Sequence, residues 1–358
     1  MKVLTEHQVV RVVFDEHKKA VGIEVITKAD PQPFIIRARK QVVVSAGALG
    51  TPQLLERSGI GAKERLAKLG VPVVADVPGV GSQYLDHQFF LTSYRSLATE
   101  EENLDGLWNG RVVPSTLIDR KDGIMGWTSM SMIGKLRPTT SELKGMGPEF
   151  QKLYEKDFRQ VMKPLGLTAA CTSLLGEHIG RAPPGQYFTI AVAVAYGYSK
   201  GSIHAGGPSI DDLPDFQAGF LSHDADVKVL IWQYKKTREI ARRMLHYNGP
   251  FEATHPVFSS LSAAGFDADL EVVRAAGNDR SVLKDIEYST EDDEVIEKYV
   301  REMVGTMWHS AGTCPMKPIS EGGVVDKSLS VYGVSGLKVT GTFPRVHVEM
   351  PSNDVSNK

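Results

Sequence analysis

The sequence has few of the features that would assign it to a simple class. Among its 358 residues only Cys171 and Cys314 are cysteines, so neither a disulfide framework nor a cysteine-based zinc site is expected. No run of about 18 apolar residues is present, which argues against a transmembrane helix. The 41 basic and 43 acidic side chains leave a formal net charge of -2. This balance gives no reason to expect nucleic acid or an anionic membrane as a partner.

Several motifs that mark particular chemistries or compartments are also missing. The sequence contains no G-x-S-x-G, no H-E-x-x-H and no His/Cys cluster, which argues against Ser/His/Asp hydrolysis and against a metal centre. No signal peptide is recognisable at the start, and the final Ser356, Asn357 and Lys358 differ from the Ser-Lys-Leu peroxisomal address. We expect an intracellular protein, cytoplasmic or peroxisomal, or a fragment of one.

What is present is an ordinary globular composition. Hydrophobic residues make up 42% and charged residues 23%, and the length suffices for one large or two ordinary domains. Alternating apolar residues predict strands at 9–14, 20–27 and 34–39, which would form a meander of hairpins. The Val-rich run at 41–45 is typical of a strand in a parallel sheet.

A glycine turn and a helix are predicted directly after that strand. Thr51 is a good N-cap and Pro52 fits the first helical position, so the helix should begin there and continue to about Ser58. A strand, a glycine turn and a helix N-terminus form an arrangement in which backbone N–H groups can face an anion. The same arrangement is common in α/β folds without a ligand, so both interpretations stay open.

The middle of the chain predicts a second, α+β region. Strand patterns at 187–198 and 201–205 lie between loops rich in Gly, Pro and Asp, and residues 224–247 have helical spacing. Ser289 or Thr290, followed by three acidic residues, predicts the start of another helix. That helix leads to a loop with the sequence WHSAGTC.

His309, in that loop, is the residue with catalytic potential. Imidazole side chains titrate near neutral pH, so one placed here can accept a proton from an alcohol. A structural histidine bonded to a backbone carbonyl fits the local sequence as well. Asp86 and His87 could form a pair, but neighbours in an extended segment point in opposite directions, which favours separate structural roles.

Four motifs, in order along the chain, carry a resemblance to a known family. They are GALGTPQLLERSGIG at 47–61, PGVG followed by LDH at 78–87, WHSAGTCPM at 308–316, and GGVVD followed by VYGVSGL at 322–337. Together they resemble the glucose–methanol–choline (GMC) oxidoreductases. The middle region, with GSIH, PDF and WQYKKTRE, looks most like the fungal methanol and alcohol oxidases of that family.

The resemblance implies an enzyme that oxidises a primary alcohol to an aldehyde by hydride transfer to FAD. It places the proton-accepting base at His309 and makes O2 a possible electron acceptor, with H2O2 as the product. The fold implied is α/β plus α+β: a partial FAD-binding domain of the glutathione-reductase type with an antiparallel-sheet substrate-binding domain. Residues 1–87 and 291–358 would belong to the first domain and residues 88–290 to the second.

The same resemblance implies where the cofactor contacts lie. The strand residue near the start would offer its backbone to the adenine, the glycine turn would lie near the ribityl and phosphate part, and the loop histidine and its neighbour would lie beside the ring. The resulting residues are Val9, Ala46, Gly47, Gly50, Trp308, His309, Gly341 and Thr342. A homo-oligomer is possible, because methanol-oxidase relatives form large ones. Which alcohol is used stays open.

Two departures from the family pattern limit these implications. The family begins with a β-α-β unit carrying G-x-G-x-x-G, which this sequence lacks, so an apolar face of the nucleotide-binding sheet should be exposed. Gly341 stands where the family has an Asp, and the second catalytic residue stays open among His347, Met350, Ser352 and Asn353. We expect a truncated gene product, a degenerate copy or a half-protein that needs a partner chain. The functional alternative is a non-catalytic fragment.

Overall fold

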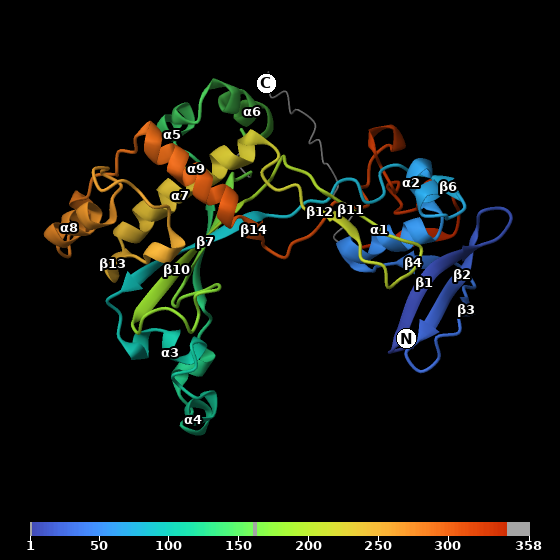
Figure 1. The fold of residues 1–358 in the computed structure, drawn as a ribbon, viewed down its shortest axis with the longest axis horizontal. Helices are drawn as coiled ribbons and strands as arrows, with labels where there is room; N and C mark the ends of the chain where they lie inside the picture. The colour runs from blue at the N-terminus through green and yellow to red at the C-terminus, as the bar shows by residue number, and fades with distance from the viewer. Residues whose placement is uncertain (1, 160–162, 342–358) are drawn as a thin grey trace, which may run out of the picture. The chain divides into compact units, whose positions relative to one another are not determined.

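The structure, a computed structural model, describes residues 2–159 and 163–341 and divides into two compact units (Figure 1). Unit 1 comprises the described parts of Met1–Asp86, Ser199–Phe220 and Trp308–Lys358. Unit 2 comprises those of His87–Tyr198 and Leu221–Met307. The chain therefore leaves and re-enters unit 1 twice.

Unit 1 begins with the expected meander. Strands β1 (His7–Phe14), β2 (Ala20–Thr27) and β3 (Phe34–Arg37) pair antiparallel in the order β1-β2-β3. The next strand, β4 (Val42–Val44), pairs in parallel with β15 (Leu337–Val339), so an early and a late segment of the chain share one small sheet. The parallel strand predicted at 41–45 is thus confirmed.

The helix after β4 begins earlier than the sequence indicated. Helix α1 spans Gly47–Arg57, so Pro52 lies inside it rather than at its first position. Thr51 is not the N-cap; its hydroxyl instead accepts a hydrogen bond from the backbone N–H of Ala46, at 3.1 Å. The prediction was wrong here because Ser/Thr-Pro is a start signal only when no helical turn precedes it, and here a turn with Gly47 at φ +85° does precede it.

One hydrophobic cluster holds unit 1 together. It joins β1, β4, α1, the loop after His309 and β15, and its fully buried members include Leu55, Ile60, Cys314, Val325 and Val339. The smaller elements around it are β5 (Ile60–Gly61), α2 (Lys63–Lys68), β6 (Ala75–Asp76), β11 (Ser202–His204), β12 (Asp215–Gln217) and η5 (Ile319–Glu321).

A buried polar contact attaches the 199–220 segment to α1. Glu56 is fully buried, and its carboxylate lies 2.7 Å from Nδ1 of His204 and accepts the N–H of Ala205 at 2.6 Å. A buried carboxylate needs such partners, because desolvation without them costs several kcal/mol, on the order of 5 or more. This contact explains why a segment from the middle of the sequence belongs to unit 1.

Unit 2 is built on one antiparallel sheet. The strands run in the order β13-β7-β10-β9-β8, with β14 also pairing with β7. Their bounds are β7 Gln88–Ser96, β8 Met130–Leu136, β9 Gly166–Cys171, β10 Gln186–Val194, β13 Tyr247–Pro250 and β14 Gly305–Thr306. The central β10 is buried over eight of its nine residues. The antiparallel substrate-domain sheet expected from the resemblance is present.

Two long helices cover that sheet, α7 (Asp224–Arg242) and α9 (Thr290–Met303) (Figure 1). The predicted start of α9 is confirmed: the Ser289 hydroxyl accepts the N–H of Asp292, whose carboxylate accepts the N–H of Ser289 in return. The other elements are η1 Glu100–Glu102, α3 Asp105–Trp108, α4 Pro114–Asp119, η2 Gly123–Gly126, α5 Thr140–Gly145, α6 Pro148–Asp157, η3 Glu252–Thr254, α8 Phe266–Ala276 and η4 Arg280–Val282.

The units divide the chain differently from the three expected segments. The first boundary, expected after residue 87, falls after Asp86. The return to unit 1 comes at Trp308 rather than at 291, because α9 packs on α7 in unit 2. The helix before the WHSAGTC loop therefore belongs to the antiparallel-sheet unit.

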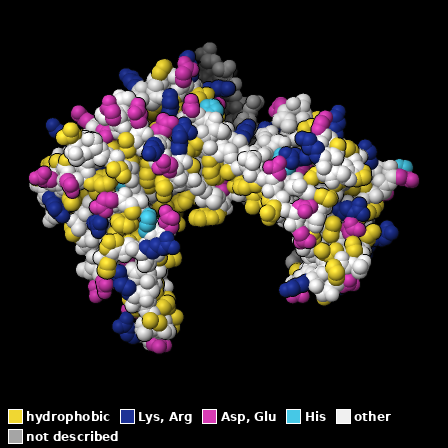
Figure 2. Space-filling model, in the orientation of Figure 1, with side chains coloured by type: hydrophobic (Ala, Val, Ile, Leu, Met, Phe, Trp, Pro, Cys, Tyr) yellow, Lys and Arg dark blue, Asp and Glu magenta, His cyan; other side chains and the backbone are white. Residues whose placement is uncertain are grey.

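Unit 1 exposes several apolar side chains in its sheets. In β4, Val42 and Val44 are buried whereas Val43, on the opposite face, is 48% exposed. Phe34 and Ile35 are also exposed, and Figure 2 shows hydrophobic side chains over the β1–β2–β3 sheet. In the described ranges no helix has both the length and the apolar composition needed to cross a bilayer. Neither do these residues gather three metal-binding side chains.

A buried histidine gives unit 2 a predictable response to pH. Nε2 of His255 donates to the Ser93 carbonyl at 2.8 Å, so Nδ1 is the nitrogen that accepts the Tyr234 hydroxyl at 3.1 Å. Burial, and then the charge of Arg238, lower the pKa of His255 to about 3. The unfolded chain, with a histidine pKa near 6.5, therefore binds a proton that the folded unit does not.

We expect the free energy of unfolding to fall as pH drops from about 6.5 towards 3, by up to about 1.4 kcal/mol per pH unit from this residue. His255→Gln keeps a donor and an acceptor but does not titrate. Urea unfolding of the parent protein and of His255→Gln between pH 7.5 and 5 gives the free energy of unfolding of each. The contributions of all other titrating groups cancel in the difference between the two proteins. Equal slopes of unfolding free energy against pH in the two proteins would contradict the lowered pKa of His255.

Candidate active site

The loop around His309 is held to unit 1 by backbone pairing. The N–H of Leu85 donates to the Ala311 carbonyl, and the N–H of Ala311 donates to the Leu85 carbonyl, both at 2.8 Å. Gly312 has φ +86°, and a Cβ there would lie 2.3 Å from the Gln83 carbonyl oxygen. Only glycine combines this backbone conformation with such a close approach. The glycine of the motif is thus required by the packing of the loop.

A side chain also fastens the loop to helix α1. Proline has no N–H, so Pro52 cannot donate to the carbonyl four residues earlier, which is that of Ala48. The hydroxyl of Thr313, fully buried, donates to this carbonyl at 2.8 Å. The Ala48 carbonyl, which Pro52 leaves without a helical donor, therefore accepts its hydrogen bond from the WHSAGTC motif. This contact places the WHSAGTC loop next to the first turn of α1.

Asp86 orients the start of the loop. One oxygen of its carboxylate accepts the backbone N–H of His309 at 3.1 Å, and the other accepts the hydroxyl of Tyr84 at 3.2 Å. The Tyr84 hydroxyl also lies 3.0 Å from the hydroxyl of Ser310. Trp308 has φ +59°, a conformation that is unfavourable for a bulky side chain. The surrounding hydrogen bonds are what hold the loop in it.

The two side chains that the sequence singled out lie at the surface of unit 1. Trp308 is 78% exposed, and His309 is also exposed. Because the backbone on either side is fixed by Asp86 and by the pairing of Ala311, the imidazole is presented from an anchored loop. An exposed imidazole on a fixed backbone is able to exchange a proton with a small molecule bound beside it.

The N-terminus of α1 is open towards an anionic group. No side chain caps the helix, and no acidic residue lies in its first turn. Gly47 has open space around its Cα, with nothing within 4 Å of a Cβ built there. Uncapped N–H groups and the helix dipole favour a phosphate or similar anion. The anion interpretation of Ala46 to Gly50 is therefore compatible with the geometry.

The remaining predicted residues divide into three cases. Val9, in β1, pairs with Val25 and packs its side chain on the core of unit 1. Gly341 is exposed, at the end of the described chain. Thr342 lies outside the described residues, as do the open candidates for the second catalytic residue, His347, Met350, Ser352 and Asn353.

Sequence reasoning missed the residues that position His309. Asp86 and His87 were considered only as a pair with each other; in the structure His87 bonds to the Val194 carbonyl in unit 2, while Asp86 turns to the His309 loop in unit 1. Asp86 and His309 are 223 positions apart, and no periodicity indicates such a contact. The available signal was that Asp86 lies within one motif and His309 within another.

Comparison with known proteins agrees with the motifs. The model of the GMC oxidoreductase N-terminal part matches residues 1–89, and that of the C-terminal part matches residues 197–352. The chain belongs to the GMC oxidoreductase family. It is 34% identical to alcohol oxidase 1 of Komagataella phaffii over 353 residues, covering 86% of this chain and 53% of that protein. It is 32% identical to the alcohol oxidase of Pichia angusta, covering 91% and 56%.

Solved structures show the same fold. A formate oxidase from Aspergillus oryzae superposes with a TM-score of 0.75 at 18% identity, covering 95% of this chain and 56% of that one. An FAD-dependent oxidoreductase from Chaetomium thermophilum gives a TM-score of 0.67 at 21% identity, with 95% and 57% covered. This GMC chain spans about half the length of the relatives and structures that it matches.

The residues present fit one side of a flavin dinucleotide. The uncapped N-terminus of α1 suits a phosphate, and the exposed Trp308 and His309 suit a planar ring beside them. The Thr313–Ala48 bond joins these two elements, so the ring side and the phosphate side are parts of one surface of unit 1. This is the fit that the family leads one to expect of the GMC chain.

The Thr313–Ala48 contact predicts a specific coupling between two motifs. Thr313→Val leaves the Ala48 carbonyl buried without a partner and should destabilise unit 1 by about 1–3 kcal/mol. Pro52→Ala supplies the missing helical N–H, so in its presence the cost of Thr313→Val should fall by about 1 kcal/mol. Thr313→Ser, which keeps the hydroxyl, is the control.

The buried thiol of Cys314 reports on this unit. Burial raises its pKa, so it should react with a disulfide reagent only after unit 1 opens. In a Cys171→Ala background Cys314 is the remaining cysteine. The urea dependence of its reaction then gives the free energy of unfolding of unit 1 for four proteins: the parent, Thr313→Val, Pro52→Ala and the double variant. Additive effects of the two substitutions would contradict the assignment of the Ala48 carbonyl.

Asp86 is predicted to fix the conformation of the loop. Asp86→Ala removes the acceptor of the His309 N–H and should raise amide hydrogen exchange at 308–311 by about tenfold or more, the equivalent of one lost charged hydrogen bond. Asp86→Asn keeps one oxygen acceptor and should exchange at an intermediate rate. Equal exchange in all three proteins would show that the pairing of Leu85 with Ala311 suffices.

Proposed function

We propose that this GMC oxidoreductase takes part in FAD-dependent oxidation of a primary alcohol to an aldehyde, with His309 as the proton acceptor. The supporting observation is the anchored WHSAGTC loop, which presents an exposed imidazole next to the first turn of α1. The similarity to fungal alcohol oxidases supports the choice of an alcohol as substrate and of O2 as electron acceptor, with H2O2 as product.

In this proposal a bound flavin would supply the hydride acceptor, and the chain supplies position and a base. His309 takes the hydroxyl proton of the alcohol, which makes hydride departure from the carbinol carbon favourable. Asp86 holds the backbone of His309, so the imidazole is positioned without a large entropic cost at the moment of reaction.

The cofactor contacts follow the same proposal. The turn and helix start from Ala46 to Gly50 lie near the phosphate and ribityl part, where the uncapped start of α1 favours negative charge. The backbone of Val9 lies near the adenine. Gly341 and Thr342 follow β15 and complete the set as predictions from the family pattern.

The second candidate function is a non-catalytic one. The observation that favours it is the small parallel sheet of β4 and β15, which has two strands in the described chain, with Val43 exposed on one face. Parallel sheets are normally covered on both faces, so such a sheet is a weak platform for a dinucleotide by itself. Cytoplasmic or peroxisomal location and homo-oligomer formation also stay predictions.

A flavin spectrum and a peroxide assay test the proposal. The purified protein should show oxidised-flavin absorbance near one FAD per chain and should produce H2O2 with a primary alcohol. His309→Ala should keep the absorbance and reduce turnover by a factor on the order of 10² to 10⁴. His17→Ala, an exposed histidine in the turn after β1, is the matched control and should leave both unchanged.

The two readouts separate the candidate functions. A colourless, folded protein would favour the non-catalytic function. Bound flavin with unchanged turnover in His309→Ala would overturn the role of His309. Turnover with an artificial electron acceptor but without peroxide would retain alcohol oxidation and exclude O2 as the acceptor.

A further inference from the structure

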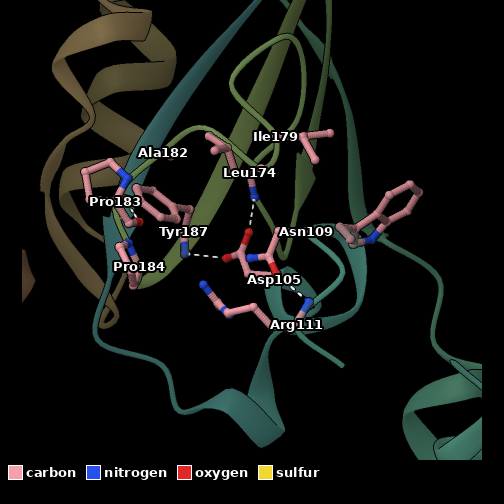
Figure 3. Close-up of a pocket in the computed structure, with 11 residues that line it drawn as sticks. Asp105, Asn109, Arg111, Leu174, Ile179, Ala182, Pro183, Pro184 and Tyr187 are labelled. Carbon is pink, nitrogen blue, oxygen red and sulfur yellow. Dashed lines mark hydrogen bonds between the residues drawn. The ribbon is translucent and has the colours of Figure 1, made fainter. Parts of the chain in front are cut away.

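Two of the cavities within unit 2 differ in how their polar groups are used. The smaller, of about 190 Å³, contains the buried Asp105 (Figure 3). Its carboxylate accepts the N–H of Leu174 at 2.8 Å and the N–H of Tyr187 at 2.6 Å, and the Tyr187 hydroxyl donates to the Pro183 carbonyl. The polar groups of this cavity hold its own loops together, so we assign it a structural role.

The larger cavity, of about 550 Å³, lies beside helix α7. Its walls come from the end of α5, from α7, from the segment before α9 and from the first turns of α9. Met146, Ile231, Trp232 and Ile286 contribute apolar surface to it. Its volume lies in the range of small-molecule pockets, about 300–1,000 Å³.

Two buried donors of this cavity have no hydrogen-bond partner in the described part of the chain. They are the indole Nε1–H of Trp232, whose side chain is 6% exposed, and the hydroxyl of Tyr288. Buried N–H and O–H groups are nearly always bonded, because an unpaired one costs about 1–3 kcal/mol. Unlike the carboxylate of Asp105, neither group has an acceptor among the residues that the structure describes.

The lining carries five carboxylates and three lysines, and one of these lysines has no carboxylate partner in the described ranges. Each lining carboxylate has a cationic partner: Glu142 with Lys236, Glu239 with Arg242, Asp285 with Arg243, Asp293 with Lys235, and Glu297 with Arg301. Lys228, on α7, has no carboxylate within 4 Å among the residues that the structure describes. Lys228 is therefore the lining cation that is left to pair with an anion.

We propose that this cavity binds a small organic carboxylate with an apolar body. The carboxylate pairs with Lys228 and accepts the Trp232 N–H, and the apolar part lies against Ile231 and Met146. Such a ligand supplies a hydrogen-bond acceptor for the unpaired Trp232 N–H and a negative charge for the unpaired Lys228. Because all of these residues belong to unit 2, the site is independent of the proposed oxidation at His309.

The indole resonances of the protein test this proposal with octanoate as the probe. The chain has four tryptophans, so ¹⁵N-labelled tryptophan gives four indole N–H signals, and Trp232→Phe identifies that of Trp232. We expect octanoate to shift the Trp232 signal downfield in a saturable way and to leave those of Trp108, Trp127 and Trp308 in place. Octanamide, of the same shape without the charge, should bind at least about tenfold more weakly.

Substitution of the cation provides the matched control. Lys228→Gln should weaken octanoate binding about tenfold, whereas Lys156→Gln, an exposed lysine on α6 outside the cavity, should not change it. No saturable shift at tens of millimolar octanoate, equal shifts of all four indoles, or equal affinity in Lys228→Gln would each overturn the proposal. Loss of flavin binding or of turnover would not, because those report on unit 1.

Discussion

One hydrogen bond connects the two most specific motifs of the chain, and the candidate site depends on it. Pro52 removes a rung of the α1 ladder and leaves the Ala48 carbonyl without its helical partner; Thr313 donates to that carbonyl from within the WHSAGTC loop. A proline inside a helix is unfavourable by about 3 kcal/mol in isolation. Here the unused acceptor becomes the attachment point for a loop more than 260 residues away, so the local cost is offset by a tertiary contact. The position of His309 relative to the start of α1 follows from this bond.

Around that bond, the loop is fixed at three more points, each with a different physical basis. The backbone pairing of Leu85 with Ala311 sets the direction of the loop, and the close approach at Gly312 excludes any larger residue. Asp86 accepts the N–H of His309 and helps to hold the unfavourable φ of Trp308. Strain of this kind persists only where the surroundings determine the conformation, and it concentrates at functional sites. The exposed imidazole thus lies on a backbone that has little freedom to move, which is what a positioned base requires.

Local features were predictable from the sequence, and contacts between distant segments were not. The meander of β1 to β3 follows from alternation, and the start of α9 follows from Ser289 and Asp292, whose capping bonds involve neighbours only. The start of α1 was misplaced because Thr51-Pro52 has the composition of a helix start, and only the tertiary use of the Ala48 carbonyl explains a proline one and a half turns into the helix. The role of Asp86 and the attachment of the 199–220 segment through Glu56 and His204 depend on pairs of residues far apart in sequence. Family motifs located His309, but they did not indicate what positions it.

The two units differ in how much of their structure is accounted for by the described chain. Unit 2 has a multi-stranded antiparallel sheet with a central strand buried throughout most of its length and two long helices packed over it, so its core is self-contained. Unit 1 has a parallel pair, β4 and β15, with Val42 and Val44 on the core face and Val43 exposed on the other. Two parallel strands gain little from each other, so the free energy that holds the His309 loop must come from the hydrophobic cluster around Leu55 and Cys314 and from the bonds of Thr313 and Glu56. A segment that covered Val43 would bury the face of this pair opposite the cluster, and the parallel strands would then be covered on both faces, as parallel sheets normally are.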